Sequence, residues 1–130
     1  MSTETAATNE RSALAAVTRG VIRIHAEYFG KGPTRARSER FGSDGLICII
    51  RETLTPVEMT LIDRGQGPQV LSLRRSFQDA MAPEFRAMVE GAVGREVEVF
   101  FSQVNLEPDV SAEVFLLKPV PWASSADEEA

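Results

Sequence analysis

The sequence predicts an α+β domain, with an antiparallel sheet of about four strands packed with an N-terminal amphipathic helix and a long, kinked central helix. Three observations lead to this fold class. Apolar residues recur at helical spacing over residues 14–28 and again over residues 70–88. Residues 95–104 and 111–118 alternate apolar and polar side chains, as the two strands of a hairpin do. Helices that flank and separate strands in this order are typical of an α+β fold.

The chain has the length and composition of one soluble globular domain. It has 130 residues, of which 43% are hydrophobic and 25% are charged. The net charge is −5, but five of the 19 acidic residues lie in the terminal flanks, so the 14 basic residues are balanced within the domain. Because nucleic-acid binding requires an excess of cations, no nucleic-acid partner is expected.

The domain is expected to span residues 9–118, between a disordered N-terminus (1–8) and a disordered acidic tail (119–130). The N-terminus lacks the regions of a secretory signal, and the longest strongly apolar run, residues 46–50, is too short to cross a bilayer. The single cysteine, Cys48, allows neither an internal disulfide nor a zinc framework. We therefore expect a cytoplasmic protein without direct membrane insertion, and with no metal and no cofactor.

The N-terminal helix is predicted from apolar residues spaced alternately three and four apart. These are Leu14, Val17, Val21, Ile24 and Tyr28. A Gly-Lys-Gly-Pro run ends this helix. Residues 34–40 then indicate a weak strand or an extended arm, and a glycine-containing turn at 41–45 leads into the buried strand LICIIRE, residues 46–52.

The middle of the chain contains a segment that fits either a helix or a strand, followed by the central helix. A Thr-Pro pair predicts a capped helix over residues 56–62, but the alternating apolar residues there fit a strand equally well. The apolar stripe of residues 70–88 keeps its phase across Pro83, which predicts a kink rather than an end. Gly94 is expected to end the helix.

The predicted hairpin is apolar on both faces. The face that contains Val97, Val99 and Phe101 is assigned to the core. Phe100, Phe115 and Leu117 then lie on the opposite face. A sheet that is apolar on both sides needs cover on both, from the first helix or from a second copy of the chain. These three residues are therefore the predicted interface of a homodimer.

The stretch GKGPTRARSERFG, residues 30–42, has two interpretations. Its cations follow a glycine-rich turn, and guanidinium groups suit the recognition of carboxylate or phosphate. The candidate ligand-binding residues are Lys31, Thr34, Arg35 and Arg37. The stretch lacks the length and the Ser/Thr ending of a P-loop, and it follows a helix rather than a strand. The favoured interpretation is a helix stop followed by a charged edge strand that resists aggregation.

No catalytic residues are predicted. His25, the only histidine, lies beside the apolar seam of the first helix, where a surface position is expected. Cys48 lies in an apolar strand, where a thiol usually serves packing. Glu107 and Asp109 flank Pro108, and turn chemistry explains them. Because no nucleophile, base and oxyanion donor are brought together, an enzyme is not expected.

Several segments, in the right order, resemble the MpsC-like family. They are GKGPTRAR after the first helix, LTPVEMTLIDRG, SLRRSFQDAMAPEFRAMVEGAVGREVEVFFS and EPDVSAEVFLL, within residues 9–118. The family pattern marks, without assigned chemistry, Gly30, Gly32, Pro33, Thr34, Arg37, Pro108 and Asp109. The resemblance implies a small protein not known as catalytic. It also implies a link to a bacterial sodium-translocating, membrane-potential-generating system that contains integral membrane proteins.

Two main hypotheses of function follow. The first is a non-enzymatic accessory or regulatory protein of the MpsC-like kind, a homodimer associated with an integral membrane complex that translocates cations. The alternative is a domain that binds a small anion or a phosphate ligand through the Gly-Lys-Gly-Pro and arginine loop. An enzyme that uses His25 is a third, weaker hypothesis.

Overall fold

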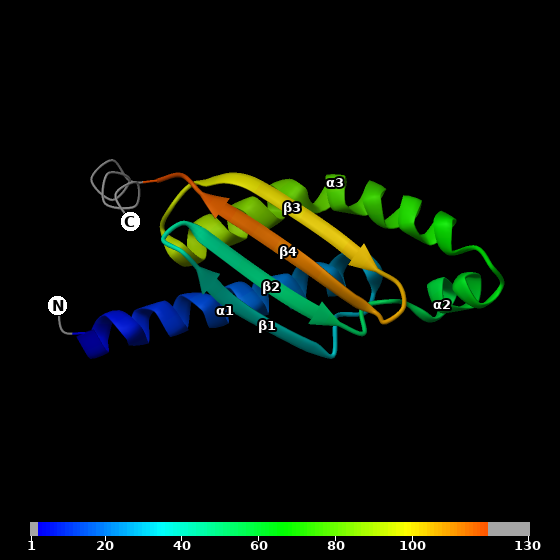
Figure 1. The fold of residues 1–130 in the computed structure, drawn as a ribbon, viewed down its shortest axis with the longest axis horizontal. Helices are drawn as coiled ribbons and strands as arrows, with labels where there is room; N and C mark the ends of the chain where they lie inside the picture. The colour runs from blue at the N-terminus through cyan, green and yellow to red at the C-terminus, as the bar shows by residue number, and fades with distance from the viewer. Residues whose placement is uncertain (1–2, 120–130) are drawn as a thin grey trace.

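The structure, a computed structural model, describes residues 3–119. Within this range the chain forms the helices α1 (Thr3–Phe29), α2 (Pro56–Asp63) and α3 (Gly67–Val93). It also forms the strands β1 (Arg35–Phe41), β2 (Gly45–Arg51), β3 (Val97–Asn105) and β4 (Val110–Leu117). Figure 1 shows the sheet in front of the two long helices, with α2 beyond one end of it. The predicted α+β fold class is confirmed.

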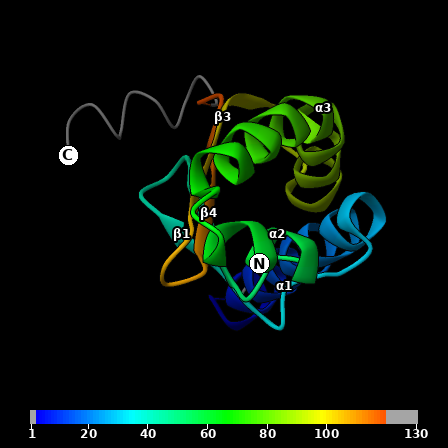
Figure 2. The same cartoon turned by 90° about the vertical axis from the view of Figure 1, so that its right-hand side faces the viewer.

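The sheet is antiparallel throughout, with the strand order β1-β2-β4-β3. Viewed along its edge, the sheet has all three helices on one side (Figure 2). Helices α1 and α3 pack against each other and against this side, which we call the covered face. We call the other side the open face, because no helix or strand of residues 3–119 lies over it. This one-sided cover is common in α+β domains.

The hydrophobic core lies between the covered face and the helices α1 and α3. Its buried members are Val17, Val21, Ile24, Leu46, Cys48, Ile50, Met81, Phe85, Val89, Val97, Phe115 and Leu117. The helical spacing read from the sequence therefore identified the buried seam of α1 correctly. Gly20 lets α1 approach α3 closely, because a Cβ at this position would lie 2.4 Å from Cγ of Met88.

The N-terminal boundary differs from the sequence prediction. Helix α1 begins at Thr3, so residues 3–8, which were expected to be disordered, are helical in the structure. Two consecutive alanines in this segment favour the helix, because alanine has the highest helix propensity. Of the predicted tail, residues 120–130 lie outside the described range.

The segment after β2, for which the sequence fits a helix and a strand equally well, is the helix α2. Helix α3 follows it after a short turn. Helix α3 continues through Pro83, as the phase of its apolar stripe predicts. It ends where Gly94 adopts the left-handed conformation, with φ of +71°. Glycine is favoured at such a position because it has no Cβ to clash with the backbone.

The face assignment of the hairpin was wrong. A β-bulge between Val97 and Val99 inserts one residue, so Val97 faces the helices whereas Val99 faces away from them. Phe100, Phe115 and Leu117 consequently lie on the covered face. Phe115 and Leu117 are buried in the core, and Phe100 packs against it. The three residues predicted as a dimer interface are therefore inside the protomer, and the apolar side that lacks cover is the other one.

Candidate functional site

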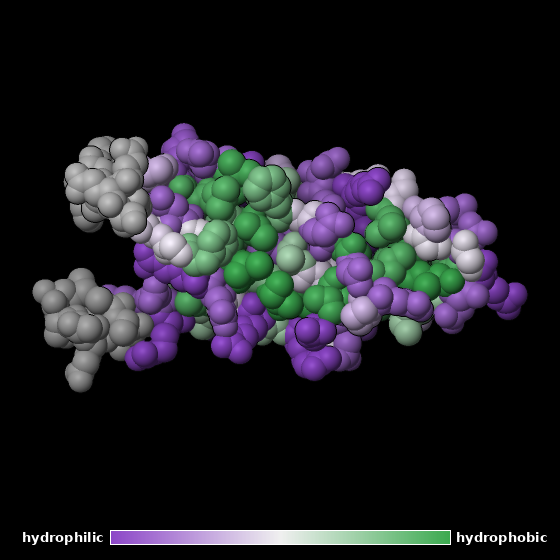
Figure 3. All heavy atoms as spheres, viewed as in Figure 1, coloured by the Kyte–Doolittle hydropathy of each residue, from purple (hydrophilic) through white to green (hydrophobic). Residues whose placement is uncertain are grey.

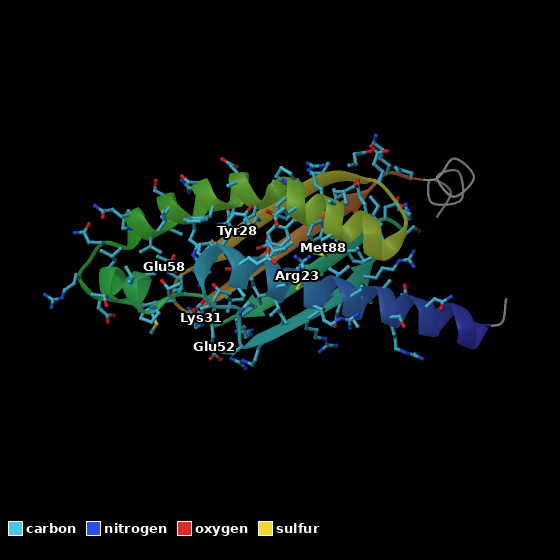
Figure 4. The ribbon with its side chains drawn as sticks, turned by 180° about the vertical axis from the view of Figure 1, so that it is seen from behind. Arg23, Tyr28, Lys31, Glu52, Glu58 and Met88 are labelled. Carbon is cyan, nitrogen blue, oxygen red and sulfur yellow. The ribbon has the colours of Figure 1, made fainter. Side chains whose placement is uncertain are left out.

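The cations of the predicted anion loop lie along the edge strand β1 and the turn before it. Lys31 donates a hydrogen bond to the backbone carbonyl of Glu52, and the two residues lie side by side in Figure 4. Arg35 pairs with the Glu52 carboxylate at 3.2 Å, and Arg37 pairs with Glu39 at 2.5 Å. The backbone N–H of Thr34 donates to the Arg51 carbonyl, and the Thr34 side chain is exposed.

These contacts match the favoured interpretation of the loop, a helix stop that leads into a charged edge strand. The side chains of Arg35 and Arg37 are largely exposed, so their ion pairs are worth little, at most about 1 kcal/mol each. Lys31 and Arg35 both bind Glu52, through its backbone carbonyl and its carboxylate, whereas Arg37 binds Glu39. Anion binding by this loop stays a prediction, and an anion would have to compete with these internal partners.

A buried ion pair lies at the α2 end of the fold. The Arg74 side chain of α3 is 2% exposed, and its Nε donates to Oε2 of Glu58 at 2.6 Å. Its Nη2 donates to Oε1 of Glu58 at 2.5 Å and to the Thr53 carbonyl at 3.0 Å. The guanidinium carbon lies 3.8 Å from the centre of the Phe29 ring, within cation–π range. Arg74 thus joins α3 to α2, to the loop after β2 and to the end of α1.

Local sequence explains why Glu58 points inward from α2, as Figure 4 shows. The Thr55 hydroxyl accepts from the Glu58 N–H at 3.3 Å, and Glu58 Oε1 accepts from the Thr55 N–H at 2.9 Å. This reciprocal pair is a capping box, which fixes the start of a helix. Burial alone would raise the pKa of Glu58, but hydrogen bonds from Arg74 and Thr55 outweigh it and lower the pKa below its usual value.

Asp109 holds the loop before α2 from the β3–β4 hairpin. Its carboxylate accepts from the backbone N–H of Thr53 at 3.2 Å and from that of Leu54 at 3.0 Å. Three of the segments that carry the family resemblance therefore meet in one network: LTPVEMTLIDRG, the SLRR run inside α3, and EPDV. We call Thr53, Thr55, Glu58, Arg74 and Asp109 the α2 network. Position Asp109, which carried no assigned chemistry, has a structural role here.

A second buried polar pair, His25 and Glu113, lies between α1 and the sheet. His25 is buried rather than on the helix surface, and its ring packs near Phe29 and Phe85. Its Nδ1 lies 3.0 Å from the Val21 carbonyl. Since a carbonyl oxygen only accepts, Nδ1 carries the proton of the neutral ring, and Nε2 is left as an acceptor. Nε2 lies 3.7 Å from Oε1 of Glu113, which is 2% exposed in the middle of the covered face.

Burial keeps both members of this pair uncharged at neutral pH. Desolvation lowers the pKa of His25 to about 4, and the charge of Arg74 adds to this effect, whereas the bond to the Val21 carbonyl opposes it. Desolvation raises the pKa of Glu113 to about 8. The charge of Arg74 and the Ser102 hydroxyl, which is close to Glu113 although outside hydrogen-bond geometry, oppose that increase. At pH 7 the pair consists of a carboxylic acid and a neutral imidazole.

A cleft of about 430 Å³ lies between α3 and β3 beside these groups, and both Arg74 and Ser102 line it. On β4, opposite Ser102 and Val104 of the cleft lining, Oε2 of Glu113 and Oγ of Ser111 are buried and have no hydrogen-bond partner among the described residues. Water molecules commonly satisfy such atoms in a polar cavity of this size. Within residues 3–119, no group of three or more His, Cys, Asp or Glu side chains is arranged to hold a metal ion.

The sequence itself contains two signals for this site. Arg74 follows Val70 by four residues and precedes Met81 by seven, so it lies in the apolar stripe of α3 and not on its solvent side. Glu113 shares its strand face with Phe115 and Leu117. A charged residue in register with an apolar stripe indicates a buried, partnered group.

The fold and this site define a class of protein: a small α+β domain with both long helices on one face of a four-stranded sheet and a buried polar network at one end. None of its helices within residues 3–119 has both the length and the apolar character that a membrane span requires. The chain belongs to the MpsC family, described as a "Na+-translocating membrane potential-generating system (MpsC)", whose model matches residues 9–119. No curated protein and no solved structure matches the chain.

Proposed function

We propose that this chain is a non-enzymatic, cytoplasmic accessory or regulatory protein that binds an integral membrane partner of a sodium-translocating, membrane-potential-generating system. The observation that carries the proposal is the family match, which covers residues 9–119 and therefore nearly the whole described chain. The system is named for ion translocation across a membrane, so a chain without a membrane-spanning helix in its described part contributes to it through a partner.

The proposal of a non-catalytic role is supported by the burial of the ionisable groups that could do acid–base chemistry. His25 and Glu113 are both almost fully enclosed, and a substrate would have to open the core to reach them. Arg74 and Glu58 satisfy each other, which is typical of a structural ion pair. Neither pair offers the accessible, correctly spaced groups that a general acid–base site needs.

The surface of α2 is the contact surface that we propose for the membrane partner. Val57 is 72% exposed and Met59 is 54% exposed, although both are large apolar residues. Met59 borders a groove of about 210 Å³ that runs between α2 and the β3–β4 hairpin, with Leu54 and Leu106 among its lining residues. Exposed apolar side chains beside a groove favour an apolar segment of another protein as the occupant. The α2 network holds this surface in a fixed orientation.

A complementation experiment tests the function. Deletion of the gene in the native host should lower the membrane potential in sodium medium, measured with a potential-sensitive dye, and the wild-type gene should restore it. A variant that carries Val57→Glu and Met59→Glu should not restore it, although its unfolding curve stays close to wild type. The matched control is Leu73→Glu, which also charges an exposed apolar residue but lies on α3. An unchanged potential after deletion would contradict the proposed function.

A further inference from the structure

The cleft between α3 and β3 has no role in the proposed function, and its size suits a small molecule. Helix α3 runs beside the edge strand β3 (Figure 1) and contacts it on either side of the cleft. On one side Phe85 stacks on Phe100, with ring centres 5.4 Å apart. On the other, a Cβ at Gly67 would lie 3.4 Å from Cδ1 of Leu106. The cleft volume of about 430 Å³ falls within the range of about 300–1,000 Å³ of small-molecule sites.

The lining of the cleft is partly apolar and partly polar. Small-molecule sites are concave and combine apolar walls with a few polar groups that fix the orientation of the ligand. Leu71, Val104 and Leu106 are half-buried and contribute the apolar part of the lining, whereas the other lining residues of α3 and β3 are polar. The open face of the sheet presents instead a broad apolar area across the strands (Figure 3). A ligand with both apolar and polar parts therefore suits the cleft better than it suits the open face.

The cleft contains one cation whose charge is not compensated. Arg74 and Arg75 both line it, but Arg74 already donates to the Glu58 carboxylate and to the Thr53 carbonyl. The Arg75 side chain is exposed and has no ion pair and no hydrogen bond within residues 3–119. Glu107, the carboxylate of the lining, forms no ion pair with either arginine. Arg75 is therefore available to an anion that enters the cleft.

The charge of this cation favours a carboxylate as the anion. A guanidinium donates two parallel hydrogen bonds to a carboxylate or a phosphate, and the side-chain amides of Gln78 and Gln103 add further donors to the lining. Arg75 alone balances one negative charge. A phosphate ester carries about 1.5 to 2 negative charges at pH 7, whereas a carboxylate carries one. A monocarboxylate thus matches the cleft in charge, and the apolar lining favours an organic one.

A hydroxyl in the cleft lining lacks a hydrogen-bond partner. Oγ of Ser102 is buried and has none among the described residues. Glu113 lies opposite Ser102 on β4, and its Oε2 also has no partner in this part of the chain. Buried polar atoms normally have a partner, so these atoms indicate that the cleft receives a polar group. Because a serine hydroxyl both donates and accepts, an amide or a hydroxyl of a ligand can satisfy Ser102.

We propose that this cleft binds a small organic monocarboxylate. The carboxylate pairs with Arg75, and a second polar group of the ligand hydrogen-bonds to Ser102. The apolar body of the ligand lies against the apolar part of the lining. An N-acyl amino acid has these three features in one molecule. The carboxylate contributes most to recognition, because charge-assisted hydrogen bonds are stronger than neutral ones.

An NMR titration of the full chain tests the site, with N-acetyl-leucine as the probe and its neutral amide as the matched ligand. N-acetyl-leucine should shift the backbone amide signals of residues 102–106 and the Nε–H signal of Arg75 until they saturate. The neutral amide should bind at least about tenfold more weakly, because it has no charge to pair with the guanidinium. No saturable shift with N-acetyl-leucine, or shifts confined to residues outside the cleft, would overturn the proposal.

Substitution of Arg75 tests the carboxylate contact. Arg75→Gln should weaken the binding of N-acetyl-leucine at least about tenfold, to the level of the neutral amide. Glutamine is a good helix former, so α3 should be preserved. The matched control is Arg64→Gln, because Arg64 is also exposed and without an ion pair among the described residues but does not line the cleft. Equal binding by wild type and Arg75→Gln, or an equal loss in the control, would overturn the proposal.

Substitution of Ser102 tests the second polar contact. Ser102→Ala should weaken N-acetyl-leucine binding at least about threefold. It should leave the binding of 4-methylpentanoate unchanged, since this acid has a similar apolar body and a carboxylate but no amide. An equal effect on both ligands would overturn the role of Ser102. Inorganic phosphate should bind more weakly than N-acetyl-leucine, and phosphate that binds equally well would overturn the assignment to an organic acid.

This inference does not rest on the proposed function. The α2 variant with Val57→Glu and Met59→Glu keeps every residue of the cleft lining and should bind N-acetyl-leucine as wild type does. If deletion of the gene leaves the membrane potential unchanged, the titration still decides whether the cleft binds a carboxylate. A wild-type chain that restores the potential but does not bind N-acetyl-leucine would overturn the cleft proposal alone.

Discussion

Glu113 makes the stability of this domain depend on pH in a direction opposite to that of a typical glutamate. Its pKa rises from an ordinary value of 4.5 to about 8 on folding. Between these values the folded chain keeps a proton that the unfolded chain has lost, so the free energy of unfolding falls as pH rises. The buried His25 acts in the opposite sense, but only between about 4 and 6.5, where its own pKa values lie.

The window from pH 6.5 to 8 therefore isolates Glu113. Each pH unit is worth about 1.4 kcal/mol, so wild type should lose about 2 kcal/mol across this window relative to Glu113→Gln. Glutamine preserves the size of the side chain and cannot ionise. Urea unfolding of both proteins at several pH values, at one fixed protein concentration, measures the difference directly.

Glu27→Gln is the control for this experiment. Glu27 is an exposed residue of α1 that pairs with Arg23, and its removal should shift the unfolding curve by a similar small amount at every pH. Groups other than Glu113 titrate in both proteins, so their contributions cancel in the comparison. Parallel pH profiles of wild type and Glu113→Gln would refute the inference that Glu113 is a neutral acid in the folded protein.

Three further predictions concern the α2 end and the close of α3. Arg74→Ala should destabilise the domain by about 3–5 kcal/mol, because it leaves the Glu58 carboxylate buried without its cation. The double variant Arg74→Met with Glu58→Gln should be destabilised clearly less. Equal losses of unfolding free energy in urea would contradict the ion pair. Thr55→Ala should cost about 1 kcal/mol by removing the hydroxyl cap of α2, and an unchanged midpoint would count against the capping box. Gly94→Ala should cost about 1–2 kcal/mol because of its positive φ, whereas Gly91→Ala, inside α3 and next to open space, should not destabilise.

Local patterns were sufficient to predict most of the elements. The spacing of Val17, Val21 and Ile24 identified the buried seam of α1, because one face of a helix repeats every 3.6 residues. The Thr55-Pro56 pair predicted a helix as one of two structures for the α2 segment. The capping box explains why the segment forms the helix. These features depend on interactions within a few residues, which a sequence displays directly.

The faces of the hairpin could not be predicted in the same way. Alternation assigns faces correctly only while the period of two is unbroken, and the bulge after Val97 breaks it without a glycine or proline to mark the position. Glu113 added to the error, since a carboxylate in an alternating strand normally marks the solvent side. In the folded chain this residue is buried as a neutral acid, because desolvation raises its pKa to about 8, so no charge is buried at pH 7. The homodimer interface predicted for Phe100, Phe115 and Leu117 followed from this reversal.

The network around Arg74 depends on contacts between distant segments, so neither spacing nor composition reveals its partners. Apart from Glu58, only Leu61 and Ile62 of α2 are even partly buried. Glu58 is the only residue of this eight-residue helix that is buried, while Val57 and Met59 face solvent. A helix attached by apolar burial tolerates small rotations, whereas bidentate hydrogen bonds from a guanidinium to a carboxylate restrict its orientation. The buried ion pair and the Asp109 contacts therefore determine where the exposed apolar residues of α2 point. The network thus joins three separated segments of this chain, which contribute Glu58, Arg74 and Asp109.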